Sequence, residues 1–261
     1  MKNVYSIPVE PIRIECSEVP GVVNGGGNFG GLYQEHDSHR YRLAETLPAS
    51  TPLIQEPQSV FFTTPENHQA FVRRMSTRES LRVAVRDQSS YDLLRNDLEN
   101  LILSPDAVHV LGRIESKPPI TRFVIPSRRD KEASKQPSPV GVTTVDWTDD
   151  DWLTTTSRRA SWKFRQVSLA KPLFYRPPRV WRLKAQKRFE RGVRVLPQGE
   201  VIITDRLHAM LIGLQMGRAV IAIDNNNHKL TSYAETWFEN EEPPVRFAKT
   251  FADALRIANH V

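Results

Sequence analysis

The sequence predicts an α/β protein in which two units of similar design each contain a mostly parallel sheet. Short apolar runs alternate with amphipathic stretches of helical spacing, which is the pattern of strands joined by helices. This pattern occurs twice, before and after the segment 112–120, whose glycine and two prolines interrupt regular structure. A length of 261 residues, with 39% hydrophobic and 25% charged positions, fits one large or two smaller globular domains.

In the first unit, strands are expected at 21–24, 52–55, 81–85 and 101–103, and helices at 35–47, 65–75 and 88–97. Pro65 followed by Glu66 predicts a helix start, since proline suits the first helical position and an acid suits the positive end of the helix dipole. Turns are expected after the strands, at 25–28, 57–59, 86–87 and 104–106. In open α/β sheets such strand ends line the ligand crevice.

The second unit is expected to follow a domain boundary between residues 117 and 118, which divides the chain into 1–117 and 118–261. Its first strand is expected at 121–125. The segment 130–155 is polar and contains prolines, so it is expected to be a loop. The later expected strands are 201–203 and 219–223, and the later expected helices are 206–216, 229–238 and 250–258.

The formal net charge of +6 is unevenly distributed. Residues 158–194 carry 13 basic residues and one acid, so this basic segment is +12 and the rest of the chain is −6. Aromatic residues alternate with these cations, which suits a nucleic-acid surface or an anionic membrane face. The alternative is an amphipathic helix over 179–191 whose cations are solvated.

The single cysteine, Cys16, cannot form an internal disulfide, so a reducing cytoplasm is the expected compartment. The longest apolar stretch is interrupted by Gln215 and Arg218, and falls short of the roughly 20 residues that span a bilayer. The N-terminus lacks the pattern of a secretory signal.

Residues 204–208 lie at the junction of a buried strand and an amphipathic helix. Thr204 or Asp205 can cap the helix. A cation is disfavoured at the positive end of a helix dipole, so Arg206 indicates a place that receives an anion. His208, one turn into the helix, is then a candidate acid or base. The alternative is that Arg206 pairs with a surface carboxylate and His208 is a hydrogen-bonded core histidine.

Two further arginines stand after the ends of expected strands. Arg86 follows 81–85, and Arg128 stands beyond 121–125. Arginine can hold a carboxylate or phosphate through two parallel hydrogen bonds. An ion pair of Arg86 with Asp87 or a neighbouring helix is the alternative. Together with Arg206, these residues predict an anionic ligand between the two units.

The glycine-rich run at 25–31 would allow phosphate or sugar to approach the backbone closely, although it matches neither the dinucleotide fingerprint nor the phosphate loop. His36 and His39 have a spacing that can hold zinc, but no further ligand cluster follows, so no metal is expected. The sequence has no nucleophile elbow, and no histidine lies near Cys16 in the sequence, so the sequence does not indicate hydrolysis by a nucleophilic side chain.

Several motifs, in their order along the chain, resemble those of the polysaccharide pyruvyl transferases. That family moves the enolpyruvyl unit of phosphoenolpyruvate onto two hydroxyls of a sugar and leaves a pyruvate ketal and free phosphate. The matching segments are the glycine-rich run 25–30, Arg86-Asp87 with Ser90-Tyr91, Ser104-Pro105-Asp106, Arg128 with Asp130 and Glu132, residues 204–208, and Asp224-Asn225 with Lys229 and residues 235–237.

The resemblance implies a glycosyltransferase-B (GT-B) type fold, with two Rossmann-like domains and the site in the cleft between them. It also implies an N-terminally shortened member whose first domain is incomplete at its start. His208 and Arg206 would be catalytic, with His208 donating a proton to the enol. The substrate-binding residues would be Gly27, Asn28, Arg86, Arg128, Arg206, Leu207, Asp224, Asn225 and Lys229.

The same resemblance implies phosphoenolpyruvate as donor substrate, no cofactor, and a saccharide acceptor of an exopolysaccharide or cell wall, in some members lipid-linked. The basic segment would then suit peripheral contact with the anionic inner membrane leaflet, and no nucleic-acid partner is expected. The alternatives are a GT-B glycosyltransferase that uses a nucleotide sugar, a basic nucleic-acid-binding protein, and an inactive truncated relative.

Overall fold

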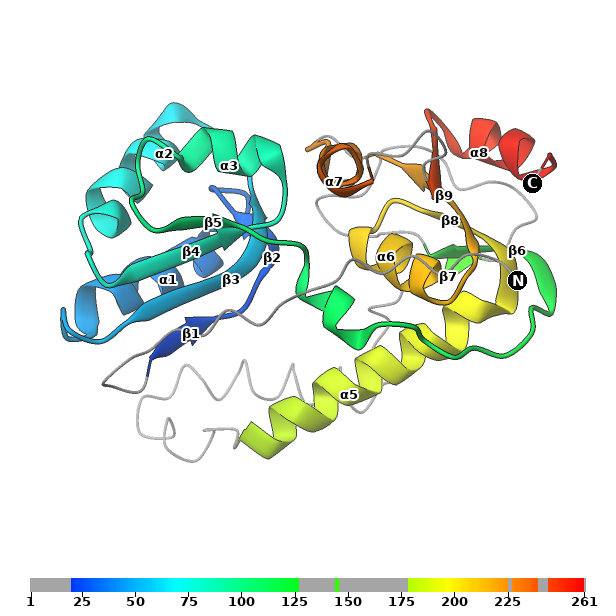
Figure 1. Cartoon of the computed structure of the whole chain (residues 1–261), viewed down its shortest axis with the longest axis horizontal. Coiled ribbons are helices and arrows are strands. Elements are labelled where there is room, and N and C mark those ends of the chain that lie inside the picture. The colour runs from blue at the N-terminus through cyan, green and yellow to red at the C-terminus, as the bar shows by residue number, and fades with distance from the viewer. Residues whose placement is uncertain (1–19, 127–143, 146–177, 225–226, 239–243, 261) are drawn as a thin grey trace.

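The computed structural model describes residues 20–126, 144–145, 178–224, 227–238 and 244–260. These residues form two five-stranded sheets in which every strand pair is parallel. Figure 1 shows the two sheets side by side, each flanked by its own helices. The predicted α/β class with parallel sheets is confirmed.

The first sheet has strand order β1-β3-β4-β5, and β2 also pairs with β3. Its strands are β1 (Gly21–Val23), β2 (Gly26–Phe29), β3 (Leu53–Val60), β4 (Leu81–Val85) and β5 (Leu101–Leu103). Its helices are α1 (Gln34–Thr46), α2 (Pro65–Phe71), which continues into a π-helical turn at Val72–Ser76, and α3 (Gln88–Leu94). Thr64 caps α2 and Pro65 is its first residue, so the predicted helix start is confirmed.

Two predicted turns of the first unit are wrong, because both segments are strands. The glycine-rich run contains β2, and residues 57–59 lie inside β3. β1 pairs with the first part of β3 and β2 with its last part. The register shifts between Gln55 and Gln58, so Pro57, which has no N–H to donate, stands where the ladder is irregular. Proline and glycine here mark that irregularity, whereas the sequence pattern suggested chain reversals.

The second sheet has strand order β10-β9-β8-β6-β7. Its strands are β6 (Thr121–Pro126), β7 (Thr144–Val145), β8 (Gly199–Thr204), β9 (Ala219–Ile223) and β10 (Val245–Ala248). Its helices are α5 (Pro178–Val195), α6 (Leu207–Gln215), α7 (Lys229–Trp237) and α8 (Phe251–Ala258). β7 lies within the segment expected to be a loop, most of which is outside the described residues. β10 was not predicted, because two of its four side chains are exposed and leave no apolar run.

Both faces of the second sheet are covered by apolar side chains. Ile202 and Val220 pack in one cluster with α6 and α7, whereas their neighbours Ile203 and Ile221 pack in another with α8. Side chains alternate between the faces of a strand, so a sheet covered on both faces needs continuous apolar runs. This burial explains why 201–203 and 219–223 were predicted as strands from short apolar runs alone.

The chain passes from the first sheet to the second through residues 104–120. This segment contains a 3₁₀ helix at Ala107–Leu111, which Asp106 caps. Ile114 N–H donates to the carbonyl of Gln215 at 3.1 Å, and Gln215 Nε2 donates to the carbonyl of Val108 at 3.0 Å. The connection is therefore fixed along α6 of the second unit.

Candidate functional site

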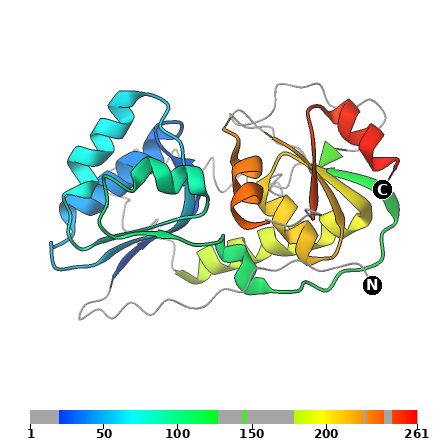
Figure 2. The same ribbon diagram turned by 45° about the horizontal axis from the view of Figure 1, so that its top comes forward.

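Hydrogen bonds join the end of β4 and the start of α3 in the first unit to helix α7 of the second. Gln88 N–H donates to Thr236 Oγ1 at 2.9 Å, and Trp237 Nε1 donates to the carbonyl of Arg86 at 2.9 Å. Figures 1 and 2 both show α3 and α7 facing each other across the space between the units. The end of β4 is thereby held against a helix of the second unit.

Arg86 directly follows β4, and its guanidinium is buried. Nε donates to Ser59 Oγ at 3.0 Å, and Nη1 donates to Asp106 Oδ2 at 2.6 Å. The alternative pairing of Arg86 with Asp87 is not what we find, because Asp87 caps α3 by accepting the N–H of Ser90 at 2.8 Å. Arg86 is therefore fixed at the strand end by groups from two neighbouring strand ends.

His208 lies in the first turn of α6, and its side chain is 55% exposed. Its Nε2 is 3.3 Å from Asp106 Oδ2, the same oxygen that accepts from Arg86. The interpretation of His208 as a core histidine is wrong, since a core side chain would be buried. An exposed imidazole beside a buried carboxylate can exchange protons with a ligand and still be held in one orientation.

The carboxylate of Asp106 is ionised in this arrangement. Burial raises its pKa, but His208, Arg86 and the N–H of Val108 more than offset burial and hold the pKa well below its usual range. The site thus brings together a buried negative charge and two cationic or ionisable groups, one of them open to solvent.

Tyr233 of α7 fixes the backbone of Asp106 from the other side. The N–H of Asp106 donates to the Tyr233 hydroxyl at 3.0 Å, and that oxygen lies 2.8 Å from His109 Nε2. Burial raises the pKa of Tyr233 and lowers that of His109, so the phenol keeps its proton and the imidazole is neutral. The hydroxyl therefore accepts from Asp106 and donates to His109.

Lys229, the first residue of α7, is 6% exposed and reaches across to the first unit. Its Nζ donates to the carbonyl of Gly27 in β2 at 2.6 Å. A Cβ on Gly27 would lie 2.8 Å from Lys229 Nζ and 3.2 Å from Arg86 Nη2. Two cationic groups, one from each unit, therefore converge on the place where Gly27 has no side chain.

Arg206 and Leu207 begin α6, one residue later than predicted. Arg206 is the half-buried N-cap, and its N–H donates to Thr204 Oγ1 at 3.1 Å. The Leu207 side chain is buried in the core cluster of the second sheet. Arg206 therefore stands next to His208 at the helix start, whereas Leu207 has only its backbone to offer a ligand.

Asn28 in β2 is fixed by a buried arginine of α1. Arg40 Nη2 donates to Asn28 Oδ1 at 2.6 Å and to Gln58 Oε1 at 2.9 Å, and Arg40 Nε donates to Gln55 Oε1 at 2.8 Å. The carboxylate of Asp37 accepts from two N–H groups of the glycine-rich run. Polar side chains beneath β2 thus set the position of Gly27 and Asn28.

Asp224 follows β9 and caps α7. Its carboxylate accepts the N–H groups of Leu230 at 3.3 Å and Thr231 at 3.1 Å. In this position it orients the helix that carries Lys229. Two other expected site residues, Arg128 and Asn225, lie outside the described residues.

At the interface of the units, the sequence interpretation missed Tyr233 and noticed Trp237 only as part of the motif at 235–237. Tyr233 and Trp237 follow Lys229 at intervals of four, which places all three on one face of α7. This spacing was a signal that could have identified them together. Asp106 was noticed only as part of a motif, and its contacts depend on the packing of the two units.

The basic segment is only partly described, and Cys16 is outside the described residues. The predicted helix over 179–191 is confirmed as part of α5, where Arg182, Lys187 and Arg188 are exposed. Within the described part of the chain, no helix is both long and apolar enough to cross a membrane.

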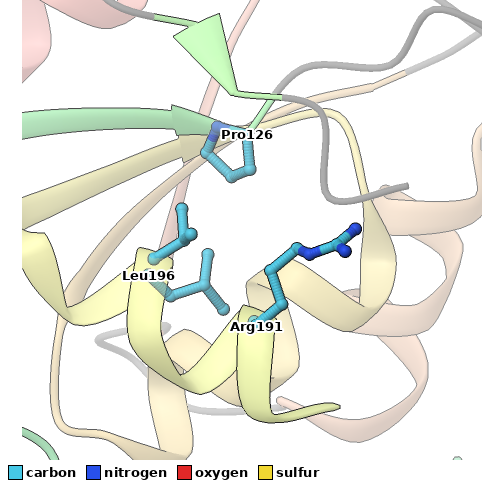
Figure 3. Close-up of a pocket in the computed structure, with 5 residues that line it drawn as sticks. Pro126, Arg191 and Leu196 are labelled. Carbon is cyan, nitrogen blue, oxygen red and sulfur yellow. The ribbon is translucent and has the colours of Figure 1, made fainter. Parts of the chain in front are cut away.

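Metal ligands do not cluster in the part of the chain that the structure describes. His36 and His39 are exposed on α1, and the described residues hold no group of three or more histidine, cysteine, aspartate or glutamate side chains suited to a metal ion. Figure 3 shows a small pocket elsewhere, at the end of β6, with the Arg191 guanidinium directed away from Leu196. The pocket has room for about one water molecule. Its lining residues are Pro126, Arg191, Gly192, Val195 and Leu196.

Fold and site together define an α/β protein with a cationic site where the carboxyl ends of two parallel sheets face each other. Residues 10–227 match the polysaccharide pyruvyl transferase family, and the chain belongs to this family.

The chain is 29% identical over 233 residues to Pyruvyl transferase 1 of Schizosaccharomyces pombe, a match that covers 82% of this chain and 53% of that protein. It is 24% identical over 229 residues to the putative pyruvyl transferase EpsO of Bacillus subtilis, covering 84% of this chain and 69% of EpsO. The chain thus spans about half the length of the first relative. These names indicate a transferase and do not favour the glycosyltransferase or nucleic-acid-binding alternatives.

The fold is also similar to the crystal structure of an uncharacterised protein from Klebsiella pneumoniae. The TM-score is 0.55 at 17% sequence identity, and the match covers 91% of this chain and 80% of that one. At this identity the likeness concerns the fold alone.

Proposed function

We propose that this chain transfers the enolpyruvyl group of phosphoenolpyruvate to a saccharide of an exopolysaccharide or cell wall, forming a pyruvate ketal and releasing phosphate. The observation that supports this most is the convergence of Arg86, Lys229 and His208 from both units in a member of this family. Phosphoenolpyruvate carries a phosphate and a carboxylate, and arginine and lysine bind such groups through charge-assisted hydrogen bonds. No cofactor enters the proposal.

In the proposed mechanism, Arg86, Arg206 and Lys229 neutralise the anionic groups of the donor. His208 transfers a proton to the methylene carbon of the enol, and the adjacent carbon becomes an oxocarbenium-like centre. A sugar hydroxyl attacks that centre and loses its proton. The C–O bond to phosphate then breaks and phosphate leaves with the electron pair. A second hydroxyl attacks the oxocarbenium-like centre that forms again and loses its proton to the phosphate, which closes the ketal. Cationic side chains and helix N–H groups stabilise the developing charge.

The remaining expected residues have supporting roles in this proposal. Gly27 and Asn28 line the donor site with backbone and amide groups, and Leu207 contributes its N–H. Arg128, Asp224 and Asn225 complete the second unit's side of the site. The arrangement is of GT-B type, with Rossmann-like domains 1–117 and 118–261 and the site in the cleft between them.

The contact with an acceptor on a membrane is also a proposal. The exposed cations of α5 suit peripheral association of the basic segment 158–194 with an anionic inner leaflet, where a lipid-linked saccharide would be presented. The protein would then act in the cytoplasm.

The proposal is tested by incubating the purified chain with phosphoenolpyruvate and a panel of galactosides, mannosides and glucosides. We expect inorganic phosphate to appear only when donor and acceptor are both present, with one ketal formed for each phosphate. Consumption of a nucleotide sugar with phosphoenolpyruvate left intact would contradict the proposal and support a glycosyltransferase.

A Gly27→Ala variant should weaken donor binding without unfolding the protein. The added methyl would lie 2.8 Å from Lys229 Nζ, which is the end of a flexible side chain and can move away. Losing one charge-assisted hydrogen bond should raise the KM for phosphoenolpyruvate about tenfold. As a control, adding Gly27→Ala to a Lys229→Ala variant should cause little further loss. Fully additive losses would show that the methyl does not act through Lys229.

A further inference from the structure

The carboxylate of Asp106 links the two ionisable groups at the centre of the candidate site. Its Oδ2 accepts from Arg86 Nη1 at 2.6 Å and lies 3.3 Å from His208 Nε2. Arg86 follows a strand of the first sheet and His208 begins a helix of the second. One oxygen atom therefore connects an anion-binding side chain of one unit with the candidate acid of the other.

Asp106 itself is poorly placed to touch a substrate. It is 4% exposed, and its other oxygen, Oδ1, accepts the N–H of Val108 at 3.0 Å. Any influence of Asp106 on a reaction must therefore pass through Arg86 or His208. This is the arrangement of a positioning residue.

The backbone of Asp106 is held rigidly enough for such a role. Its N–H is bonded to the hydroxyl of Tyr233, which is bonded in turn to His109. Tyr233 and His109 are both buried, and their nearly parallel rings have centroids 6.1 Å apart. A change of the Asp106 side chain that keeps its size should leave this framework in place.

We propose that Asp106 is a positioning residue that holds the imidazole of His208 by Nε2 and restrains Arg86 until an anion occupies the site. This inference rests on the proposed function. An anionic donor shares the Arg86 guanidinium with Asp106, which leaves more of the carboxylate's charge to act on His208. Nε2–H faces Asp106, so the second proton of the charged ring lies on Nδ1, and this is the proton that passes to the substrate.

The test is an Asp106→Asn variant, which keeps the size of the side chain and the cap of the 3₁₀ helix but removes the charge and puts an N–H donor in place of the Oδ2 acceptor that faces Arg86 and His208. We expect kcat to fall by about tenfold to a hundredfold, the size of one charge-assisted hydrogen bond. The KM for phosphoenolpyruvate should stay the same or fall, because Arg86 no longer has a competing anion. A merely structural role would instead raise KM, and that result, or an unchanged kcat, would overturn the inference.

A matched control is Asp253→Asn, which removes a carboxylate that pairs with Arg256 at 2.7 Å on the distant helix α8. This variant should leave both kinetic constants unchanged.

A second measurement does not depend on activity. Nitrogen-15 NMR of the His208 ring distinguishes its two nitrogens, and in the wild type the neutral ring should carry its proton on Nε2, facing Asp106. In Asp106→Asn this preference should be lost, and identical tautomer populations in the two proteins would overturn the inference. If the wild type releases no phosphate from phosphoenolpyruvate, the proposed function fails, while the NMR result still decides whether Asp106 positions His208.

Discussion

A His208→Gln variant is expected to lose about 10²- to 10⁴-fold in phosphoenolpyruvate-dependent turnover, the usual contribution of a positioned acid or base. Glutamine can keep a hydrogen bond to Asp106 but cannot deliver a proton at neutral pH. The His208 side chain is 55% exposed, so its replacement should cost little stability. The measurement is the rate of phosphate release with a saccharide that the wild type uses.

The chain offers a matched control for this variant. His68 also lies next to an aspartate, with Nε2 2.6 Å from Asp97 Oδ2, but it belongs to α2 of the first unit. His68→Gln should turn over at the wild-type rate. If His208→Gln kept full pyruvylation, His208 would not be the proton donor.

An Arg86→Met variant is expected to lower the free energy of unfolding by about 3–5 kcal/mol, as when one partner of a buried ion pair is removed. Methionine has a similar length but leaves the carboxylate of Asp106 buried without its closest cation, and leaves Ser59 without its Nε donor. Unfolding in urea at neutral pH measures the loss. Donor binding should be lost as well, because Arg86 is a proposed anion ligand.

Two comparisons separate this charge effect from lost packing. Adding Asp106→Asn to Arg86→Met should restore part of the stability, because the unpaired charge is gone. Arg256→Met, which removes the exposed partner of Asp253, should change stability little. If the double variant were no more stable than Arg86→Met, the loss of stability in Arg86→Met would come from lost packing and not from the unpaired charge.

The pH dependence gives a further check on the same pair. Burial raises the pKa of Asp106, but His208 and then Arg86 hold the folded-state pKa below its ordinary value, so the stability from these contacts is fully present above the unfolded pKa of about 3.9. That stability is lost as the pH falls toward the folded-state pKa. Wild type and Arg86→Met share the same unfolded state, so the difference in their unfolding free energies should shrink once Asp106 of the variant is protonated, as the pH falls toward the lower folded-state pKa of Asp106 in the wild type.

Much of the candidate site followed from the sequence because of one property of parallel sheets. All strands of such a sheet point the same way, so polar residues that follow successive strands collect at one edge. Arg86, after β4, and His208, after β8, were predicted in this way, and both lie where the units face each other. Leu207 was predicted from its motif alone, and its side chain is in the core.

The elements that the sequence did not predict are those in which local pattern and tertiary pairing disagree. β2 consists of two glycines, an asparagine and the buried Phe29, and it becomes a strand by pairing with the last part of β3. Its place is then fixed by the buried Arg40. No periodicity within residues 26–29 could report that partner, since the partner lies about thirty residues away.

By itself, the sequence determined the α/β class, the apolar strands of the second sheet and the strand ends that carry Arg86 and His208. These features depend on short-range patterns of apolar and polar residues, which each segment contains in full. Only the tertiary structure decided that Asp106 lies between Arg86 and His208, that Lys229 reaches Gly27, and that Tyr233 braces the junction. Each of these contacts joins residues that are distant along the chain, and its geometry is set by the packing of one unit against the other.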